Sequence, residues 1–185
     1  MLKPLSKDFR GLVTISGPTK SGKSELAEFL IKDQQNITYM ATSRLRQNDP
    51  DWQRRITIHR RRRPNSWKLV EYPFDIVQSI KSLGKYEAIL IDSLGGLVEQ
   101  YLDINQEDWN SFQIQFVNCL SNYEYGIIVV SEEIGWGIVP ATPLGHLFRE
   151  RHSYLFSELN RYSSRKWLAL NGIAIDLDNF GYKIP

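Results

Sequence analysis

A glycine-rich run near the start of the chain has the residue types and the spacing to bind phosphate. The run Gly17-Pro18-Thr19-Lys20-Ser21-Gly22-Lys23-Ser24 follows a short apolar segment and precedes a segment of helical pattern. Its glycines let the backbone turn tightly and approach an anion, and the N–H groups of the loop and of the following helix point at that anion. Lys23 supplies a positive charge for the β- and γ-phosphates, and the Ser24 hydroxyl is placed to bind Mg²⁺. We therefore predict a phosphate-binding loop (P-loop) for ATP or GTP, in which Lys20 either adds charge or is solvated.

A second oxygen ligand for the metal is expected at the end of a neighbouring strand. Asp92 directly follows the apolar run Ala88–Ile91 and fits this place. An ionised aspartate at the end of a buried strand needs a partner, which Mg²⁺ or the Ser24 hydroxyl would supply. The alternative is that Asp92 caps a helix beginning near Leu94. We favour the metal-binding role.

A histidine stands inside an arginine-rich segment, Arg54-Arg55-Ile56-Thr57-Ile58-His59-Arg60-Arg61-Arg62-Arg63-Pro64. A basic run of this kind is typical of a solvated face or of nucleic-acid binding. Arginines also bind triphosphates bidentately and stabilise the charge that develops in phosphoryl or nucleotidyl transfer. Neighbouring cations favour the neutral imidazole of His59, which is its nucleophilic form. The residues alone leave both interpretations open.

A pair of acids, Glu132 and Glu133, follows another apolar strand and precedes a loop containing Gly135, Trp136 and Gly137. The acids are placed to reach a metal or a substrate hydroxyl, whereas a solvated surface turn is a fair alternative for Glu132 and a weaker one for Glu133. Trp136 either forms an apolar wall for a ligand or packs within the chain. The remaining histidines, His146 and His152, are expected to pack or to lie on a helix surface.

These candidate residues are positioned by short apolar strands that alternate with helical segments. Strands are predicted at 11–16, 37–41, 67–71, 87–92, 126–131, 166–171 and 173–177. Helices are predicted at 24–32, 51–61, 74–83, 94–102, 109–123 and 143–160. The alternation predicts an α/β fold with a mostly parallel sheet and helices on both faces. The length of 185 residues suits one nucleotide-binding domain spanning 1–185, with 1–10 as an N-terminal extension.

Composition narrows the class of protein. The formal net charge of +2 is too small to indicate nucleic acid as the partner. Cys119 is the single cysteine, so we expect a reducing compartment and a small buried apolar role for this residue. The longest apolar runs are far shorter than a membrane helix requires, and we predict a cytoplasmic protein.

Several motifs, taken in order, resemble those of the bifunctional adenosylcobinamide kinase / adenosylcobinamide-phosphate guanylyltransferase family of cobalamin biosynthesis. They are GPTKSGKSELAE, ITYMATS, WQRRITIHRRRRPNSW, ILIDSLGGLVEQYL, VVSEEIGWGIVPATPLGHLFRER and KWLALNGIAIDL. They span nearly the whole chain. The patterns R-I-x-x-H-R-x-x-R-P and E-x-G-x-G-I-V-P are much more specific than the P-loop.

The resemblance implies a RecA-like P-loop domain, usually assembled as a homo-oligomer. It implies an enzyme that uses GTP or ATP with Mg²⁺ to phosphorylate the aminopropanol hydroxyl of adenosylcobinamide. GMP would then pass from GTP to that phosphate through a guanylylated histidine, which matches His59; nucleic acid is not an expected partner. Lys23 and Asp92 are the other expected catalytic residues, and Ser24 and Asp92 the expected metal ligands. The implied nucleotide-binding residues are Gly17 to Ser24, Ala41, Thr42, Ser43, Arg61, Arg62, Arg63, Pro64, Glu71 and Asp92.

The chain departs from the family pattern at two places. Many members have Asn-Glu where this chain has Glu132-Glu133, and Gly-Arg-x-Asn-Gln where it has Ser153–Ser157. Two other functions stay in competition: a small-molecule P-loop kinase without a histidine intermediate, and a nucleotide-dependent nucleic-acid-binding module.

Overall fold

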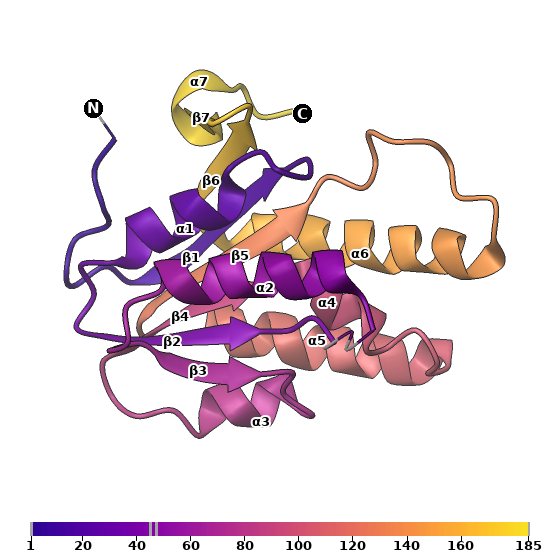
Figure 1. Cartoon of the computed structure of the whole chain (residues 1–185), viewed down its shortest axis with the longest axis horizontal. Helices are drawn as coiled ribbons and strands as arrows, with labels where there is room; N and C mark the ends of the chain where they lie inside the picture. The colour runs from indigo at the N-terminus through magenta and orange to yellow at the C-terminus, as the bar shows by residue number, and fades with distance from the viewer. Residues whose placement is uncertain (1, 45, 47, 185) are drawn as a thin grey trace.

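The computed structural model describes residues 2–44, 46 and 48–184, and within them seven strands form one sheet with helices on both faces (Figure 1). Met1, Leu45, Gln47, Pro185 and the side chain of Arg55 lie outside the described part. The strand order is β3-β2-β4-β5-β1-β6-β7. β1 to β6 pair in parallel, and β7 pairs antiparallel with β6. The prediction of an α/β fold with a mostly parallel sheet is confirmed.

The strands are β1 (Gly11–Gly17), β2 (Asn36–Ala41), β3 (Lys68–Glu71), β4 (Glu87–Asp92), β5 (Gly126–Glu132), β6 (Ser163–Leu170) and β7 (Ile173–Asp176). The helices are α1 (Lys23–Ile31), α2 (Pro50–Arg62), α3 (Ile76–Lys81), α4 (Leu94–Glu99), α5 (Gln106–Ser121), α6 (Pro143–Tyr162) and α7 (Leu177–Phe180). None of the helices among the described residues is long and apolar enough to cross a membrane.

The two faces of the sheet build two separate apolar layers. Successive strand residues point to opposite faces, so Ala88 and Leu90 of β4 pack with α1, whereas Ile89 and Ile91 pack with α3 to α6. β4 and β5 are buried on both sides, which explains why their sequences are continuous apolar runs and not alternating ones.

Local sequence fixes where the helices begin. The N-cap side chains of α2, α3, α5 and α6 each accept a hydrogen bond from a backbone N–H in the first turn; they are Asp49, Asp75, Asn105 and Thr142. Proline occupies the first turn of α2 and of α6, where its missing N–H costs no hydrogen bond.

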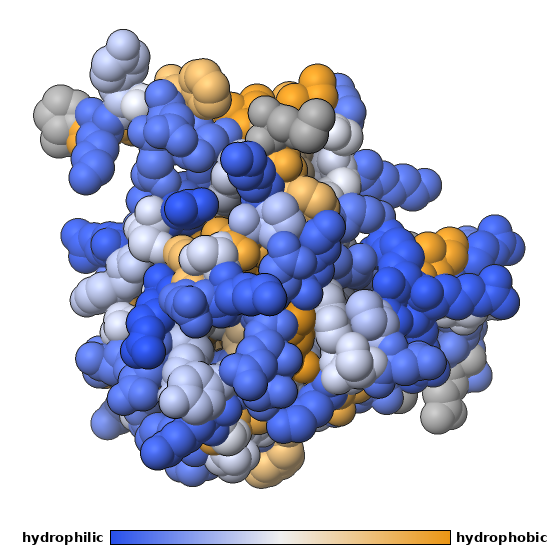
Figure 2. Space-filling model, turned by 90° about the vertical axis from the view of Figure 1, so that its left-hand side faces the viewer, coloured by the Kyte–Doolittle hydropathy of each residue, from blue (hydrophilic) through white to orange (hydrophobic). Residues whose placement is uncertain are grey.

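The strands β1 to β5 end at one edge of the sheet, towards the right in Figure 1. The last residues of β1 to β5 at this edge are Gly17, Ala41, Glu71, Asp92 and Glu132. Open α/β sheets bind ligands at this carboxyl edge. The opposite edge, seen in Figure 2, is largely hydrophilic, with apolar residues gathered at the top of the view near β7 and α7.

A hydrogen bond joins the turn between β6 and β7 to the P-loop. Asn171 and Gly172 both have left-handed backbone, with φ values of 51° and 77°. An Asn-Gly pair is the favoured sequence for a two-residue hairpin turn of this kind. The Gly172 N–H donates to the Ser21 carbonyl oxygen over 3.0 Å. The hairpin therefore supports the P-loop from the side away from β5.

Gly96 of α4 packs closely against the segment that follows β2. We therefore expect Gly96→Ala to destabilise the fold. The added Cβ would lie 2.5 Å from Ser43 Oγ and 2.8 Å from the Ser43 backbone nitrogen. Overpacking of this kind typically costs about 1–3 kcal/mol. Urea denaturation of the purified variant measures the loss.

Gly135→Ala is the matched control, because no heavy atom of the described chain lies within 4 Å of a Cβ built there. Its free energy of unfolding should stay within about 0.5 kcal/mol of the parent protein. Equal stabilities of the two variants would show that α4 does not pack this closely.

Candidate active site

The P-loop runs from the end of β1 into α1 and borders a cavity of about 560 Å³. Gly22 has a φ of 95°, which glycine adopts at little cost. A Cβ on Gly17 would lie only 2.3 Å from the Ala169 carbonyl oxygen, so this position also requires glycine. Gly22 is the N-cap of α1 and has no side chain to cap it. The first N–H groups of α1 are therefore left for an anion.

Two polar side chains of the P-loop are arranged for an anionic ligand. The Lys23 ammonium donates to the Pro18 carbonyl oxygen over 3.0 Å and so bends over the loop. The Ser21 hydroxyl is buried and hydrogen-bonds to no atom of the described chain. A buried hydroxyl without a partner costs free energy, and a phosphate oxygen would satisfy it.

Asp92 lies across the cavity from the P-loop, at the end of β4. Its Oδ2 accepts a hydrogen bond from the Tyr39 hydroxyl over 2.5 Å. Burial and the adjacent Asp92 carboxylate raise the pKa of Tyr39 well above its ordinary value, so the phenol keeps its proton. The N-cap of α4 is Ser93, so the alternative that Asp92 caps this helix is wrong.

His59 reaches the same cavity from α2. Its Nδ1 lies 3.9 Å from Asp92 Oδ2 and 3.2 Å from Arg62 Nη2. Burial lowers the pKa of His59 below its ordinary value; Asp92 opposes this effect and Arg62 reinforces it. Since the pKa falls, the imidazole is neutral at pH 7 and can act as a nucleophile towards phosphorus.

Arg62 and Arg63 join α2 to the rest of the site. Arg62 pairs with Glu25 and, over 3.3 Å, with Glu28, so it links α2 to the first two turns of α1. The Arg63 guanidinium lies 4.1 Å from the centre of the Tyr39 ring, and its Nε donates to the His59 carbonyl oxygen over 3.1 Å. Both arginines line the cavity, where they can meet the negative charge of a triphosphate.

The chain matches the profile of the family described as "Cobinamide kinase / cobinamide phosphate guanyltransferase" over residues 13–177. The chain belongs to this family. It is 26% identical over 181 residues to the "Bifunctional adenosylcobalamin biosynthesis protein CobU" of Escherichia coli K12, covering 90% of this chain and 99% of the relative. It is 28% identical over 166 residues to CobP of Pseudomonas aeruginosa, a protein of the same description, covering 88% and 95%.

A solved structure supports the fold of this family member. An ATPase from the type III secretion system of pathogenic bacteria superposes with a TM-score of 0.54 at 9% sequence identity, covering 94% of this chain and 59% of that chain. A likeness at this identity concerns the fold alone. The prediction of a RecA-like P-loop fold is confirmed.

The structure brings most of the nucleotide-binding residues expected for this family to one cavity. Besides His59, Arg62, Arg63 and Asp92, the lining includes Thr19 to Ser24, Ala41, Ser43 and Glu71. Gly17 and Pro18 form the base of the loop behind this lining. Arg61 and Pro64 are exposed outside the cavity. Thr42 is buried and joins two strand ends, because its hydroxyl donates to the Ser93 carbonyl oxygen over 2.5 Å and accepts from the Ser93 N–H.

The alternative of a solvated surface turn is wrong for Glu132, because this residue lines the cavity and its carboxylate is hydrogen-bonded, whereas Glu133 is not among the residues that line the cavity. Glu132 accepts hydrogen bonds from the Ser93 hydroxyl and, over 3.0 Å, from the Gly95 N–H. Burial alone would raise the pKa of its carboxyl group, but the neighbouring His152 ring and the hydrogen bond from Ser93 lower that pKa below its ordinary value.

His152 of α6 packs in the interior, as expected, but it also faces an acid that the sequence interpretation did not pair with it. Its Nε2 lies 3.6 Å from Glu132 Oε2. A signal for burial was present, because His152 shares the helical spacing of Leu155 and Leu159, which are both buried. Trp136 is 61% exposed in the loop after Glu133, so the alternative that it packs within the chain is wrong.

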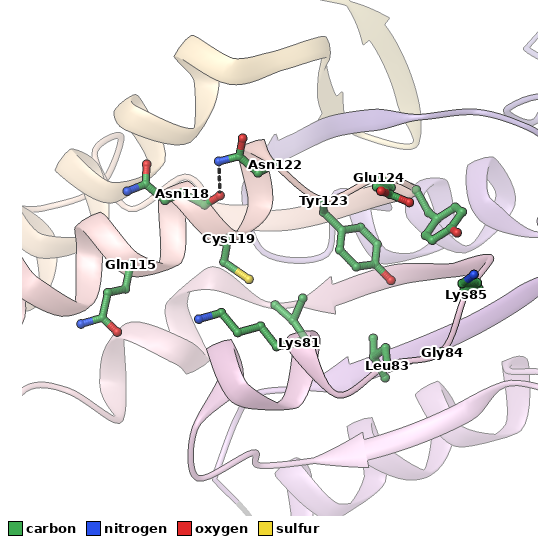
Figure 3. Close-up of a pocket in the computed structure, with 12 residues that line it drawn as sticks. Lys81, Leu83, Gly84, Lys85, Gln115, Asn118, Cys119, Asn122, Tyr123 and Glu124 are labelled. Atoms are coloured by element: carbon green, nitrogen blue, oxygen red, sulfur yellow. Dashed lines mark hydrogen bonds between the residues drawn. The ribbon is translucent and has the colours of Figure 1, made fainter.

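A second cavity, of about 550 Å³, lies between α3 and α5 (Figure 3). Its lining includes Lys85 and Tyr125, which precede β4 and β5, so it lies towards the amino edge of the sheet and away from the P-loop. Cys119 of α5 points into it, and burial raises the pKa of the thiol. The thiol packs against the apolar core but is only partly buried, so the expectation of a buried apolar residue holds in part.

Proposed function

We propose that this protein phosphorylates adenosylcobinamide, using ATP or GTP with Mg²⁺, and transfers GMP from GTP to the resulting phosphate through a guanylylated His59. The observation that carries the proposal is that a neutral imidazole and a P-loop border the same cavity. Membership of the cobinamide kinase / cobinamide phosphate guanyltransferase family supports the choice of substrates.

The phosphorylation step depends on holding the triphosphate. The P-loop N–H groups and Lys23 bind the β- and γ-phosphates of the nucleotide. Mg²⁺ usually takes one or two protein oxygens and completes its shell with water and phosphate, so the Ser24 hydroxyl and the Asp92 carboxylate fit it. When bound, the metal would neutralise charge on the phosphate oxygens. The substrate hydroxyl attacks the γ-phosphorus and the nucleoside diphosphate leaves.

The guanylyl step uses two displacements at the α-phosphorus of GTP. A nitrogen of His59 forms a bond to that phosphorus, and the bond to the bridging oxygen breaks, so pyrophosphate leaves with the electron pair. An oxygen of adenosylcobinamide phosphate then attacks the phosphorus and releases the imidazole. Splitting one displacement into two in this way is nucleophilic catalysis. Arg62 and Arg63 are placed to stabilise the negative charge in both steps.

The arginine run is divided between the cavity and the surface, which favours the nucleotide over a nucleic acid as its partner. Arg62 and Arg63 line the cavity. Arg60 donates to Glu71 over 2.6 Å. Arg54 and Arg61 are exposed. A docking patch for nucleic acid would instead present the run as one continuous basic surface.

Product analysis tests this proposal. The protein is incubated with adenosylcobinamide, ATP and Mg²⁺, and GTP is added in a second stage. Chromatography should show the phosphate after the first stage, and adenosylcobinamide-GDP with one equivalent of pyrophosphate after the second. A phosphate that never receives GMP would identify a kinase without the second activity, and no phosphate at all would refute the proposal.

A further inference from the structure

Glu132 occupies a distinctive place at the carboxyl edge of the sheet. β5 lies between β1, which leads into the P-loop, and β4, which ends at Asp92. In the register of the two strands Glu132 pairs with Gly17, the first residue of the P-loop. Glu132 therefore lies between the strand end that carries the P-loop and the strand end that carries Asp92, and it lines the cavity with both.

The Glu132 carboxylate is held in one position. Oε1 accepts from the Ser93 hydroxyl, and Oε2 accepts from the Gly95 N–H over 3.0 Å. Gly95 allows this approach, because a Cβ there would lie 2.6 Å from Oε2. An ionised carboxylate has about four lone-pair sites. These contacts leave acceptor capacity on the Glu132 carboxylate, and the residue lines the cavity.

His152 of α6 lies next to the Glu132 carboxylate. The residue is 2% exposed, and its ring lies between those of Phe148 and Phe156 on α6. Its Nε2 is 3.6 Å from Glu132 Oε2 and 3.3 Å from Ser131 Oγ. A histidine enclosed in this way has few other orientations, so it fixes the direction of the acid.

The negative charge of a bound triphosphate limits the roles that the Glu132 carboxylate can have. A carboxylate beside a triphosphate is repelled by it, because like charges a few ångströms apart disfavour one another. The arrangement is favourable when the carboxylate accepts a hydrogen bond from a donor that lies between the two. The acceptor hydroxyl of a phosphoryl transfer is such a donor, and it must lose its proton during the reaction.

We propose that Glu132 is the general base of the phosphorylation step and that His152 is a positioning residue for it; the proposal rests on the function proposed above. The substrate O–H bond breaks and its proton passes to a Glu132 oxygen. The hydroxyl oxygen forms a bond to the γ-phosphorus, and the bond from that phosphorus to the bridging oxygen breaks. The nucleoside diphosphate takes that electron pair, and Glu132 later releases the proton to water.

Glu132→Gln tests the base, because it keeps the shape of the side chain and removes its capacity to take a proton. The turnover number for phosphorylation of adenosylcobinamide should fall by about 10²–10⁴-fold. The KM values for the nucleotide and for the corrinoid should change little. Glu107→Gln is the control, since this exposed acid lies in the first turn of α5 and does not line the cavity.

GMP attachment from GTP is measured in the same variants, because it needs no proton from a hydroxyl. Normal attachment together with slow phosphorylation in Glu132→Gln is the expected result. Phosphorylation at the parent rate in Glu132→Gln would overturn the role of Glu132 as general base. Loss of both reactions together would overturn it as well, because it would mean that Glu132 only maintains the site. Absence of GMP attachment in the parent protein would instead contradict the proposed function.

Two substitutions of His152 test its positioning role. His152→Phe fits between the neighbouring rings but has no donor, whereas His152→Gln retains an N–H. The Phe variant should lower the turnover number with little change in KM, and the Gln variant should recover much of the rate, at similar thermal midpoints. Equal turnover numbers in the two variants would overturn the positioning role.

Discussion

Replacing Lys23 with alanine is expected to lower the rates of both phosphorylation and GMP attachment by about 10²–10³-fold. The Lys23 ammonium is held over the P-loop by the Pro18 carbonyl oxygen. In the proposed function both reactions use a triphosphate in the cavity that Lys23 lines, so its ammonium would meet the β- and γ-phosphates in each. Initial rates with saturating nucleotide measure the loss, and calorimetry gives the accompanying change in nucleotide affinity.

Lys32→Ala is the matched control for this change. Lys32 lies at the other end of α1, where its ammonium is 4.6 Å from the centre of the Phe29 ring. Both variants should keep the fold, because neither lysine is part of the apolar core. Parent-like rates in Lys23→Ala would show that the triphosphate binds elsewhere.

Replacing His59 with alanine is expected to abolish the attachment of GMP while phosphorylation continues at a rate near that of the parent. The neutral imidazole is the nucleophile in the proposed guanylyl step, and no bond to phosphorus can form without it. In the proposed kinase step the P-loop and Asp92 hold the triphosphate and the metal, and Asp92 keeps its hydrogen bond from the Tyr39 hydroxyl when His59 is removed. Incubation with GTP labelled at the α-phosphate, followed by denaturing gel electrophoresis, measures the attachment.

His146→Ala is the corresponding control, since this exposed histidine lies on the first turns of α6. It should keep full labelling. Label that persists in His59→Ala would show that another residue is the nucleophile. Loss of phosphorylation in the same variant would assign His59 to the shared binding of nucleotide and not to covalent catalysis.

Features that depend on local sequence could be predicted from the sequence. The P-loop follows from glycines at fixed spacing between a strand and a helix, and the continuous apolar runs of β4 and β5 follow from burial on both faces. Element ends depend on less visible contacts. α2 begins at Pro50 because the Asp49 side chain caps it, and β6 begins at Ser163, whose hydroxyl donates to Thr14 of β1.

Contacts between distant segments could not be predicted in the same way. The Tyr39–Asp92 hydrogen bond joins residues on adjacent parallel strands, and their pairing becomes visible only once the strand order is known. Glu132 ends β5 and His152 lies on α6, and the two side chains meet only in the folded chain. No sequence motif pairs these two residues. The sequence therefore left Glu132 either as a ligand for a metal or a substrate hydroxyl or as a solvated acid, and left His152 as a packing or helix-surface residue.

The most direct test of the account is the mass of the protein after exposure to GTP and Mg²⁺ in the absence of a corrinoid, followed by peptide mapping. The account predicts that one GMP is added per chain, that it is attached to the peptide containing His59, and that one pyrophosphate is released. A protein of unchanged mass, or GMP bound to a residue outside the cavity, would contradict it.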